Sequence, residues 1–268
     1  MSVVAQVVPG PRAGEIGVLG PRVGLGAGFA AVYRAQLSRA RVARIPLLFV
    51  ATFQSVGIMV MMRGVVHAGD GEAARAVVAG SSVLVVAFVA LNLLAQYFGQ
   101  LRASGGLDHY ATLPVPPAAV VLGAAGAYAS FTVPGTLVTA VTGCVLFHLP
   151  PANLWVLAVV IPLAGAALSG LGAALGLLAP RQEIATLFGQ LGMSAALLLG
   201  VLPASHMPAP ISWTRDLLPS TYGVEAFART FDAHPDWAAV FGDLSVCAAV
   251  GVASLAVATR AYRRAACR

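Results

Sequence analysis

The chain has 268 residues, of which 59% are hydrophobic and 10% charged, and all 16 of its basic residues are arginines. Soluble domains carry charge on about a quarter of their residues, so this composition excludes a soluble globular protein and indicates an integral membrane protein. A chain without lysine also lacks the lysine of a Walker A loop, which excludes nucleotide binding of that kind.

Uncharged stretches predict six membrane-spanning helices, because a helix needs roughly 20 apolar residues to cross the hydrocarbon core. Residues 109–180 hold no Asp, Glu, Lys or Arg and are long enough for two spans, turned at residues 148–153. The expected fold class is therefore all-α, a polytopic membrane protein with one transmembrane domain over residues 28–264. The spans are predicted at residues 45–63, 76–101, 117–147, 153–179, 184–203 and 238–260.

The arginines predict the orientation. An even number of spans leaves both termini on one face, and that face collects twelve arginines and three acids. The other face collects seven acids and four arginines, namely Arg63, Arg75, Arg215 and Arg229. By the positive-inside rule, both termini are expected in the cytoplasm, with residues 1–27 as a mobile tail and residues 265–268 as a short cytoplasmic end.

Residues 28–43 are predicted to form an interfacial helix before the first span. Its apolar arc would lie among the lipids at the cytoplasmic surface. Such a helix either serves only as an arginine-anchored support for the first span or also touches a soluble partner. The arc comprises Phe29, Val32, Tyr33, Leu37, Ala40 and Ala43, flanked by Arg34 and Arg41 on one edge and by Arg39 on the other.

Two further segments between spans are unusual. The cytoplasmic turn of residues 101–117 favours a short helix between the pair Gly105-Gly106 and Pro114, because glycine and proline punctuate its ends. The outer segment of residues 203–237 is interrupted by five prolines, so re-entrant half-helices are expected there, enclosed by protein or by a water-filled cavity. The prolines are Pro203, Pro208, Pro210, Pro219 and Pro235.

No catalytic site, cofactor site or metal site is expected in this chain. The stretch of residues 70–75 resembles part of the CDP-alcohol phosphotransferase signature, but the further aspartates of that signature are missing. Intramembrane proteolysis needs a serine with a histidine, or paired aspartates, inside the bundle. The histidines all map to loops or span ends, and no Cys and His spacing fits a metal site.

The spans themselves are poor in chemistry. Gln54, Asn92, Gln96 and Gln190 are the largest polar side chains within or near them, and they are candidates for lining a pathway, although interhelical hydrogen bonds explain them equally well. Gly172 and Gly176 have GxxxG spacing, which favours close helix packing either within the chain or in a dimer; packing within the chain is expected. The absence of charge at any predicted midplane argues against an ion-coupled carrier.

Residues 28–264 resemble the membrane subunit of a bacterial ABC-2 type exporter, the family that includes daunorubicin-resistance permeases. Two motifs carry the resemblance. The first lies in the cytoplasmic turn and comprises Gly106, Leu107, Asp108, Leu113 and Pro114, and the second precedes the last span and comprises Pro219, Tyr222, Glu225 and Arg229. One departure is that only Arg102 supplies charge just before the glycine pair.

The resemblance implies two permease subunits, identical or homologous, and two separate ATPase subunits that hold ATP and Mg²⁺. Residues 108–113 would seat in a cleft of the ATPase as a coupling helix, beside the interfacial helix. Leu107, Tyr110 and Leu113 would then make packing contacts and Asp108 a polar contact.

The cargo would be apolar or amphipathic, and the setting the bacterial plasma membrane, with lipid but no nucleic acid as a partner. A membrane scaffold or accessory subunit remains an alternative. A stand-alone secondary carrier is another, although it would tend to show inverted repeats and intramembrane ionisable groups.

Overall fold

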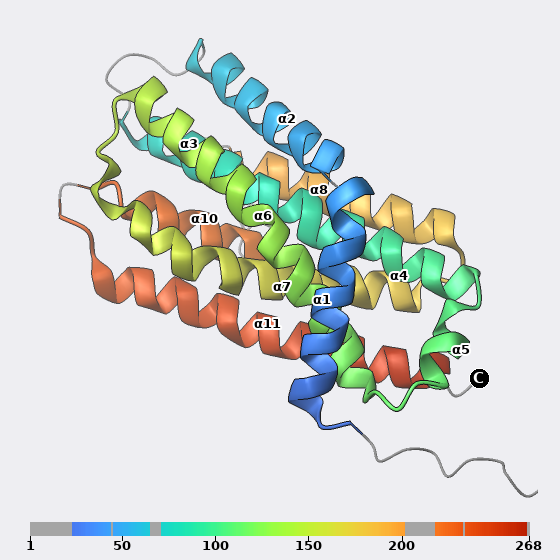
Figure 1. Cartoon of the computed structure of the whole chain (residues 1–268). Coiled ribbons are helices and arrows are strands. Elements are labelled where there is room, and N and C mark those ends of the chain that lie inside the picture. Colours follow the sequence, from blue (N-terminus) through green and yellow to red (C-terminus); the bar gives the residue numbers. More distant parts are fainter. Residues whose placement is uncertain (1–22, 44, 65–70, 202–217, 233, 267–268) are drawn as a thin grey trace, which may run out of the picture.

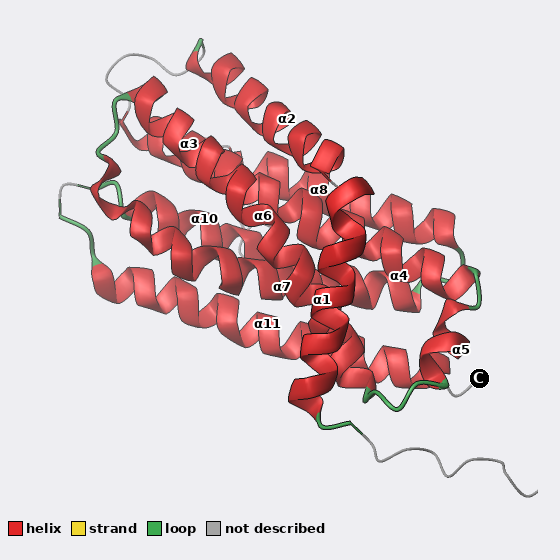
Figure 2. Cartoon of the chain, in the orientation of Figure 1, coloured by secondary structure: helices red, strands yellow, loops and turns green. Residues whose placement is uncertain are grey.

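The computed structural model describes residues 23–43, 45–64, 71–201, 218–232 and 234–266, and over these residues it contains helices and connecting turns but no strand (Figures 1 and 2). The all-α fold is therefore confirmed. The predicted calls on residues 1–22, 203–217 and 267–268 lie outside the described residues. The elements are α1 (Leu25–Ala43), α2 (Ile45–Arg63), α3 (Gly71–Val86), η1 (Ala87–Leu93), α4 (Leu94–Ala103), α5 (Gly106–Ala111), α6 (Pro117–Phe147), η2 (Pro151–Val156), α7 (Leu157–Leu178), α8 (Gln182–Val201), α10 (Pro219–Arg229) and α11 (Trp237–Ala266).

Within the described residues, six helical stretches are long and apolar enough to cross a membrane, as the sequence predicts. They run over Ile45–Arg63, Gly71–Ala103, Pro117–Phe147, Pro151–Leu178, Gln182–Gly200 and Trp237–Ala265. The second begins at Gly71 rather than at residue 76, because the helix continues through Glu72 and Arg75 beyond its apolar part. A prediction based on uncharged stretches leaves out this charged helical turn.

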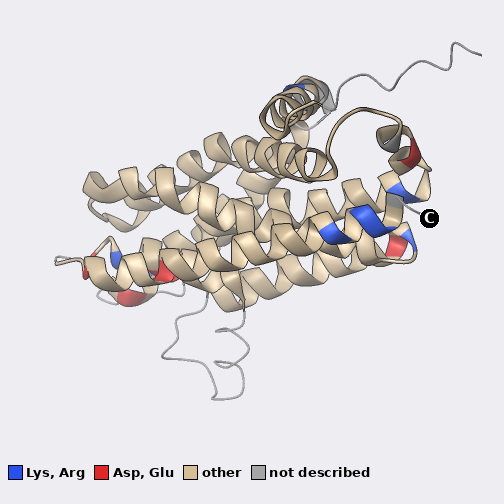
Figure 3. Cartoon of the chain, turned by 90° about the horizontal axis from the view of Figure 1, so that it is seen from below, with Lys and Arg blue, Asp and Glu red and all other residues tan. Residues whose placement is uncertain are grey.

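Charged residues gather toward the two ends of the bundle and on α1 (Figure 3). The end where α11 finishes carries Arg260, Arg263 and Arg264, with Arg102 beside them, and we call it the arginine-rich end. The end where α11 begins carries Asp236 and Asp243, with Glu225 and Asp232 close by, and we call it the acidic end. This separation is the pattern expected of a bundle whose middle lies in hydrocarbon.

Helix α7 lies at the centre of the bundle, in contact with α4, α6, α11 and η1. Its glycines allow this close approach. A methyl group at Gly172 would collide with the carbonyl oxygen of Leu91, and one at Gly176 would collide with that of Ala95. The GxxxG pair therefore serves packing within the chain, and this prediction is confirmed.

The second span is one continuous rod made of α3, η1 and α4. The seven residues of η1 are wound as a π-helix, a wide form that is rare and often found at functional sites. The rod has 33 residues and would extend about 50 Å at 1.5 Å per residue, longer than a hydrocarbon core of about 30 Å. A rod of this length would tilt or extend past the core, and α5 follows at its arginine-rich end.

Helices α2 and α8 lie at the periphery. Only 17% of the α2 window and 28% of the α8 window are buried within the chain, against 89% of the second span. Both pack on α3, and their outer faces carry large exposed side chains such as Phe49, Phe53 and Phe188. Those faces are left for lipid or for another protein.

The helix predicted over residues 28–43 is present as α1, which runs across the bundle rather than along it (Figure 1). Part of its apolar arc packs on the bundle itself. Val32 is 6% exposed and packs against Gly123 of α6, while the ring of Phe29 reaches Gly126. Periodicity identifies the apolar face of a helix but not what covers it, and here much of the cover is α6.

Candidate functional site

Helix α5 begins at a pair of glycines, Gly105 before the helix and Gly106 as its first residue. Gly105 has φ of 70°, in the left-handed region that favours glycine. Gly106 approaches α4 so closely that a methyl group there would lie 2.6 Å from Cδ1 of Leu101. The predicted short helix in this turn is confirmed, and its glycine pair has a steric reason.

The side chains of this turn divide between the core and the surface. Leu107 is only 4% exposed and packs in the chain's own core with Phe98 and Tyr262. The expectation that Leu107 touches an ATPase is therefore corrected, because its side chain holds α5 to the bundle. Asp108 is exposed and Leu113 is 39% exposed, so the outward face of the turn consists of these residues and their neighbours.

A groove of about 450 Å³ separates α1 from α5 at this end of the bundle. Backbone pairing closes one edge of it, since the amide of Val23 donates to the carbonyl oxygen of Pro114 at 3.1 Å. The groove opens beside the exposed turn. Its lining comprises Ala31, Val32 and Ala35 of α1 and Leu101, Gly106, His109, Tyr110, Leu113 and Val115.

Of the residues predicted for the interfacial helix, Phe29, Tyr33 and Leu37 are half-buried and Arg34 is exposed. The Tyr33 hydroxyl donates to Oγ of Ser130 on α6 at 3.0 Å. The side chains of Arg39 and Arg41 lie outside the described part of the molecule. Helix α1 thus contributes one wall of the groove while its first arginine points away from the bundle.

Arg102 joins the start of this turn to the end of α7. Its Nη1 donates to the carbonyl oxygens of Leu177 and Ala179, at 2.8 Å and 2.7 Å. The last carbonyls of a helix have no partner within the helix, and a cation beside them also interacts favourably with the helix dipole. The single charge before the glycine pair therefore has a structural partner in this chain.

A polar cluster behind α5 was not predicted. Gln36 of α1 is 1% exposed, and its Nε2 donates to the hydroxyl of Tyr97 on α4 at 2.5 Å. The Tyr97 oxygen in turn lies 3.4 Å from that of Tyr110 on α5. Tyrosines near span ends are commonly membrane-surface anchors, so the sequence gives no signal that these three side chains meet.

The four candidate pathway residues fall into two groups. Asn92 is 4% exposed in η1, and its Oδ1 accepts from Nε2 of Gln96 at 3.0 Å, a bond within one span rather than between helices. Gln54 on α2 and Gln190 on α8 are both exposed. The four therefore do not meet in one place within the chain.

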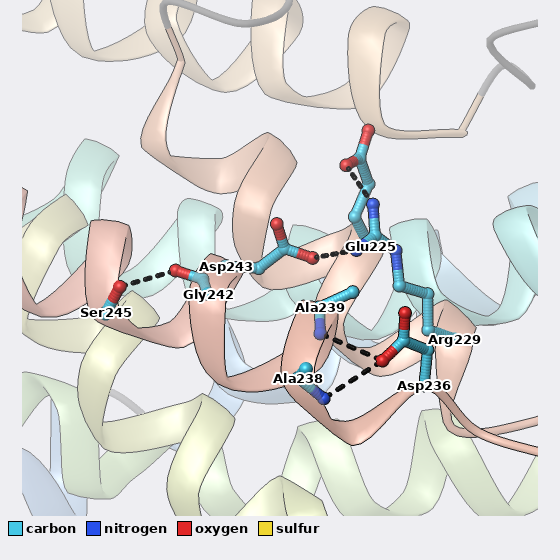
Figure 4. A network of polar contacts seen from close by, with 8 residues as sticks. All are labelled: Glu225, Arg229, Asp236, Ala238, Ala239, Gly242, Asp243 and Ser245. Atoms are coloured by element: carbon cyan, nitrogen blue, oxygen red, sulfur yellow. Dashed lines mark hydrogen bonds and ion pairs between the residues drawn. The ribbon is translucent and has the colours of Figure 1, made fainter.

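The outer motif forms α10, a short helix enclosed by α3, α7 and α11. Pro219 occupies its first turn, and Tyr222 is half-buried. Figure 4 shows the guanidinium of Arg229 between two carboxylates, at 3.4 Å from Glu225 and 3.2 Å from Asp243. The pair with Asp243 joins α10 to α11 at the acidic end, whereas the pair with Glu225 lies within α10.

Two further contacts strengthen the acidic end. Asp236 accepts from the backbone amides of Ala238 and Ala239 at 3.1 Å and 3.3 Å, and so caps the first turn of α11 (Figure 4). Arg75 of α3 pairs with Asp232. The charged residues of this end thus stabilise the packing of the helices and the start of α11.

Helix α5 and the groove beside it form the candidate site at the arginine-rich end of the bundle. Within the described residues, no group of three or more His, Cys, Asp or Glu side chains could hold a metal ion. What the site offers instead is an exposed turn on buried anchors, beside a groove.

Comparison with protein families gives one match, to the ABC-2 type transporter family over residues 29–231. Comparison with curated proteins found no match. The matched region runs from α1 through α10 and so includes the groove, α5 and the outer motif. Members of this family span the membrane and work with an ATPase carried by a separate subunit. The chain belongs to the ABC-2 type transporter family and is a permease subunit of an ABC transporter.

Proposed function

We propose that this permease is part of an exporter for apolar or amphipathic molecules and that the ATPase docks on α5 and in the groove beside α1. The observation that carries the proposal is the division of the turn. Leu107 anchors it inside the bundle, while Asp108 and Leu113 stand exposed beyond the end of the second span. Leaving an apolar side chain such as Leu113 in water is unfavourable, and a partner's cleft would cover it.

The anchoring makes α5 suitable for transmitting movement. It contacts α4 and α11, and Arg102 ties the adjoining end of α4 to α7. A force applied to α5 by a closing ATPase would therefore reach three spans as a rigid-body displacement. Binding of ATP at the partner then changes which conformation of the permease is populated.

A second permease subunit, identical or homologous, is proposed to cover the outer faces of α2 and α8. Gln54 lies at the middle of α2 and Gln190 near the middle of α8, and both amides are exposed. Polar groups in contact with hydrocarbon are costly and usually face protein or a water-filled cavity. Their exposure in the single chain supports a pathway between two subunits.

The proposed apolar or amphipathic cargo is based on the lack of charge in the spans. The stretches expected to cross the hydrocarbon core carry no charged residue at their centres, so the pathway offers little to a strongly charged solute. In this proposal the arginine-rich end and both termini lie in the cytoplasm of a bacterium. Helix α10 is then the returning arm of a re-entrant segment on the outer side, and two ATPase subunits act beneath two permeases.

The proposal is tested by identifying what the permease binds. The tagged full chain is extracted from its native membrane in mild detergent, and the co-purifying proteins are identified and quantified by mass spectrometry. A P-loop ATPase in near-equal amount is expected. Recovery of the chain alone across several mild detergents would contradict the proposal and would favour a carrier or a scaffold.

A pair of variants tests the docking surface itself. Leu113→Arg places a charge on the exposed turn and is expected to reduce ATPase recovery at least tenfold, which corresponds to about 1.4 kcal/mol. The matched control is Gln182→Arg, at an exposed position where α8 begins at the same end of the bundle. Equal ATPase recovery with both variants would show that α5 is not the docking element.

A further inference from the structure

The buried polar cluster behind α5 joins side chains of three elements. Gln36 belongs to α1, Tyr97 to α4 and Tyr110 to α5, and their polar atoms lie in sequence at 2.5 Å and 3.4 Å. The groove separates α5 from the middle of α1, at Ala31, Val32 and Ala35. The route through Tyr97 is thus a direct side-chain connection between α5 and the helix on the far side of the groove.

Burial leaves this cluster with spare hydrogen-bonding capacity. The Oε1 atom of Gln36 is buried and has no hydrogen-bond partner, and the same is true of the hydroxyl of Tyr262 on α11. Tyr262 packs in the same cluster as Tyr97 and Tyr110. Buried polar groups are nearly always paired, so the unused Gln36 oxygen and Tyr262 hydroxyl leave this part of the core able to form further hydrogen bonds.

The contact between Tyr97 and Tyr110 also leaves room for other hydrogen bonds. Hydroxyl groups bond best at oxygen separations of 2.5–3.0 Å, and 3.4 Å between Tyr97 and Tyr110 is long for such a bond. A small displacement of α5 would change this separation in either direction. The Gln36 amide and the Tyr262 hydroxyl are then available to the tyrosine hydroxyls as alternative partners.

We propose that Gln36 and Tyr97 are positioning residues that carry a displacement of α5 to α1 and α4 during the ATP cycle. The inference rests on the proposed function, because it assumes that a partner moves α5. The hydroxyls exchange partners within the buried cluster as α5 shifts, so the three helices stay connected in both arrangements. Because α1 also lines the groove, its movement changes the surface that the partner meets.

Hydrogen exchange on the complete permease–ATPase complex in lipid nanodiscs tests this proposal. Deuterium uptake is compared with and without the magnesium complex of a non-hydrolysable ATP analogue, in peptides that cover α1 and α5. The variants are Tyr97→Phe, which keeps the ring edge-to-face with that of Phe98, and Gln36→Met. The matched control is Tyr33→Phe, which removes the bond from α1 to Ser130 and leaves the cluster intact.

In the wild type, the nucleotide is expected to change uptake in both α1 and α5. In Tyr97→Phe and Gln36→Met, the α5 response should persist while the α1 response falls about two- to tenfold, the effect of one hydrogen bond on an equilibrium. Tyr33→Phe should respond as the wild type does. The persisting α5 response also shows that each variant is folded and bound to its ATPase.

Two results would refute the reasoning at different points. An α1 response in both variants equal to that of the wild type would mean that the ATPase acts on α1 directly, and the positioning role would be wrong while the proposed function stood. A wild-type complex in which α5 does not respond to nucleotide would refute the proposed coupling function, and this inference with it.

Discussion

Replacing Arg102 by glutamine should destabilise the arginine-rich end of the bundle. The wild-type side chain makes two bonds from Nη1 to the carbonyl oxygens of Leu177 and Ala179. Hydrogen bonds that involve a charged group contribute about 1.5–3 kcal/mol each. Both bonds come from one nitrogen of a half-exposed side chain, so we expect a combined loss of about 2–3 kcal/mol, less than the sum of two independent bonds of this kind.

The loss can be measured as thermal stability of the purified chain in detergent, followed by the temperature at which monodisperse protein disappears. At about 2–4 °C per kcal/mol for a chain of this size, Arg102→Gln should lower that temperature by about 5–10 °C. Arg102→Lys keeps the charge but loses the planar guanidinium group, so its temperature should lie between those of the wild type and Arg102→Gln.

The matched control is Arg264→Gln. Arg264 and Arg102 line one cavity beside Leu177, but Arg264 makes no hydrogen bond to another described residue. This control removes the same charge from the same end of the bundle. If both glutamine variants lowered the temperature equally, the stabilisation would come from net charge at this end and not from capping of α7.

Two other substitutions test packing and charge inside the bundle. Gly172→Ala should cost about 1–3 kcal/mol, because the added methyl group would meet the carbonyl oxygen of Leu91. Gly57→Ala, where no atom lies within 4 Å of the added group, should be neutral or slightly stabilising; equal melting temperatures for the two would contradict the assigned contact. Arg229→Gln leaves the carboxylate of Asp243 in a 9% exposed position with one counter-charge fewer, and should cost about 2–3 kcal/mol, below the 3–5 kcal/mol of a fully buried pair. Adding Asp243→Asn should recover most of that loss in thermal unfolding, and a double variant as unstable as the single one would show that the ion pair is not the cause.

The spans and α5 were predictable because their signals are local. A run of apolar residues of sufficient length has few alternatives to crossing a membrane. Likewise, the glycine pair and Pro114 delimit a helix within a dozen residues. The first and third spans were predicted at the bounds that the structure has, Ile45–Arg63 and Pro117–Phe147. The second was predicted too short, because its charged first turn is helical although it is not apolar.

The contacts were harder to predict, because they depend on which helices become neighbours. Gln36 and Tyr97 are 61 residues apart, and neither belongs to a recognisable pattern. The same difficulty explains Leu107. Its place in a motif indicated importance, but only the packing of α5 on the bundle shows that the side chain points inward. Sequence patterns thus predicted the short helix in the turn, whereas the division of its side chains into buried and exposed ones required the fold.

Exposed residues on a membrane bundle can indicate where partners bind, and what they indicate depends on their depth in the membrane. Exposed apolar residues on the spans say little, because lipid covers Phe49 or Phe53 as well as a protein would. An exposed amide at mid-span, as at Gln54, or an exposed leucine beyond the membrane, as at Leu113, is unfavourable in its own surroundings. These two kinds of exposure lie at different depths of one chain, so one kind of partner cannot cover both. In the proposed complex, a second permease covers the exposed amides and the ATPase subunit covers the exposed leucine.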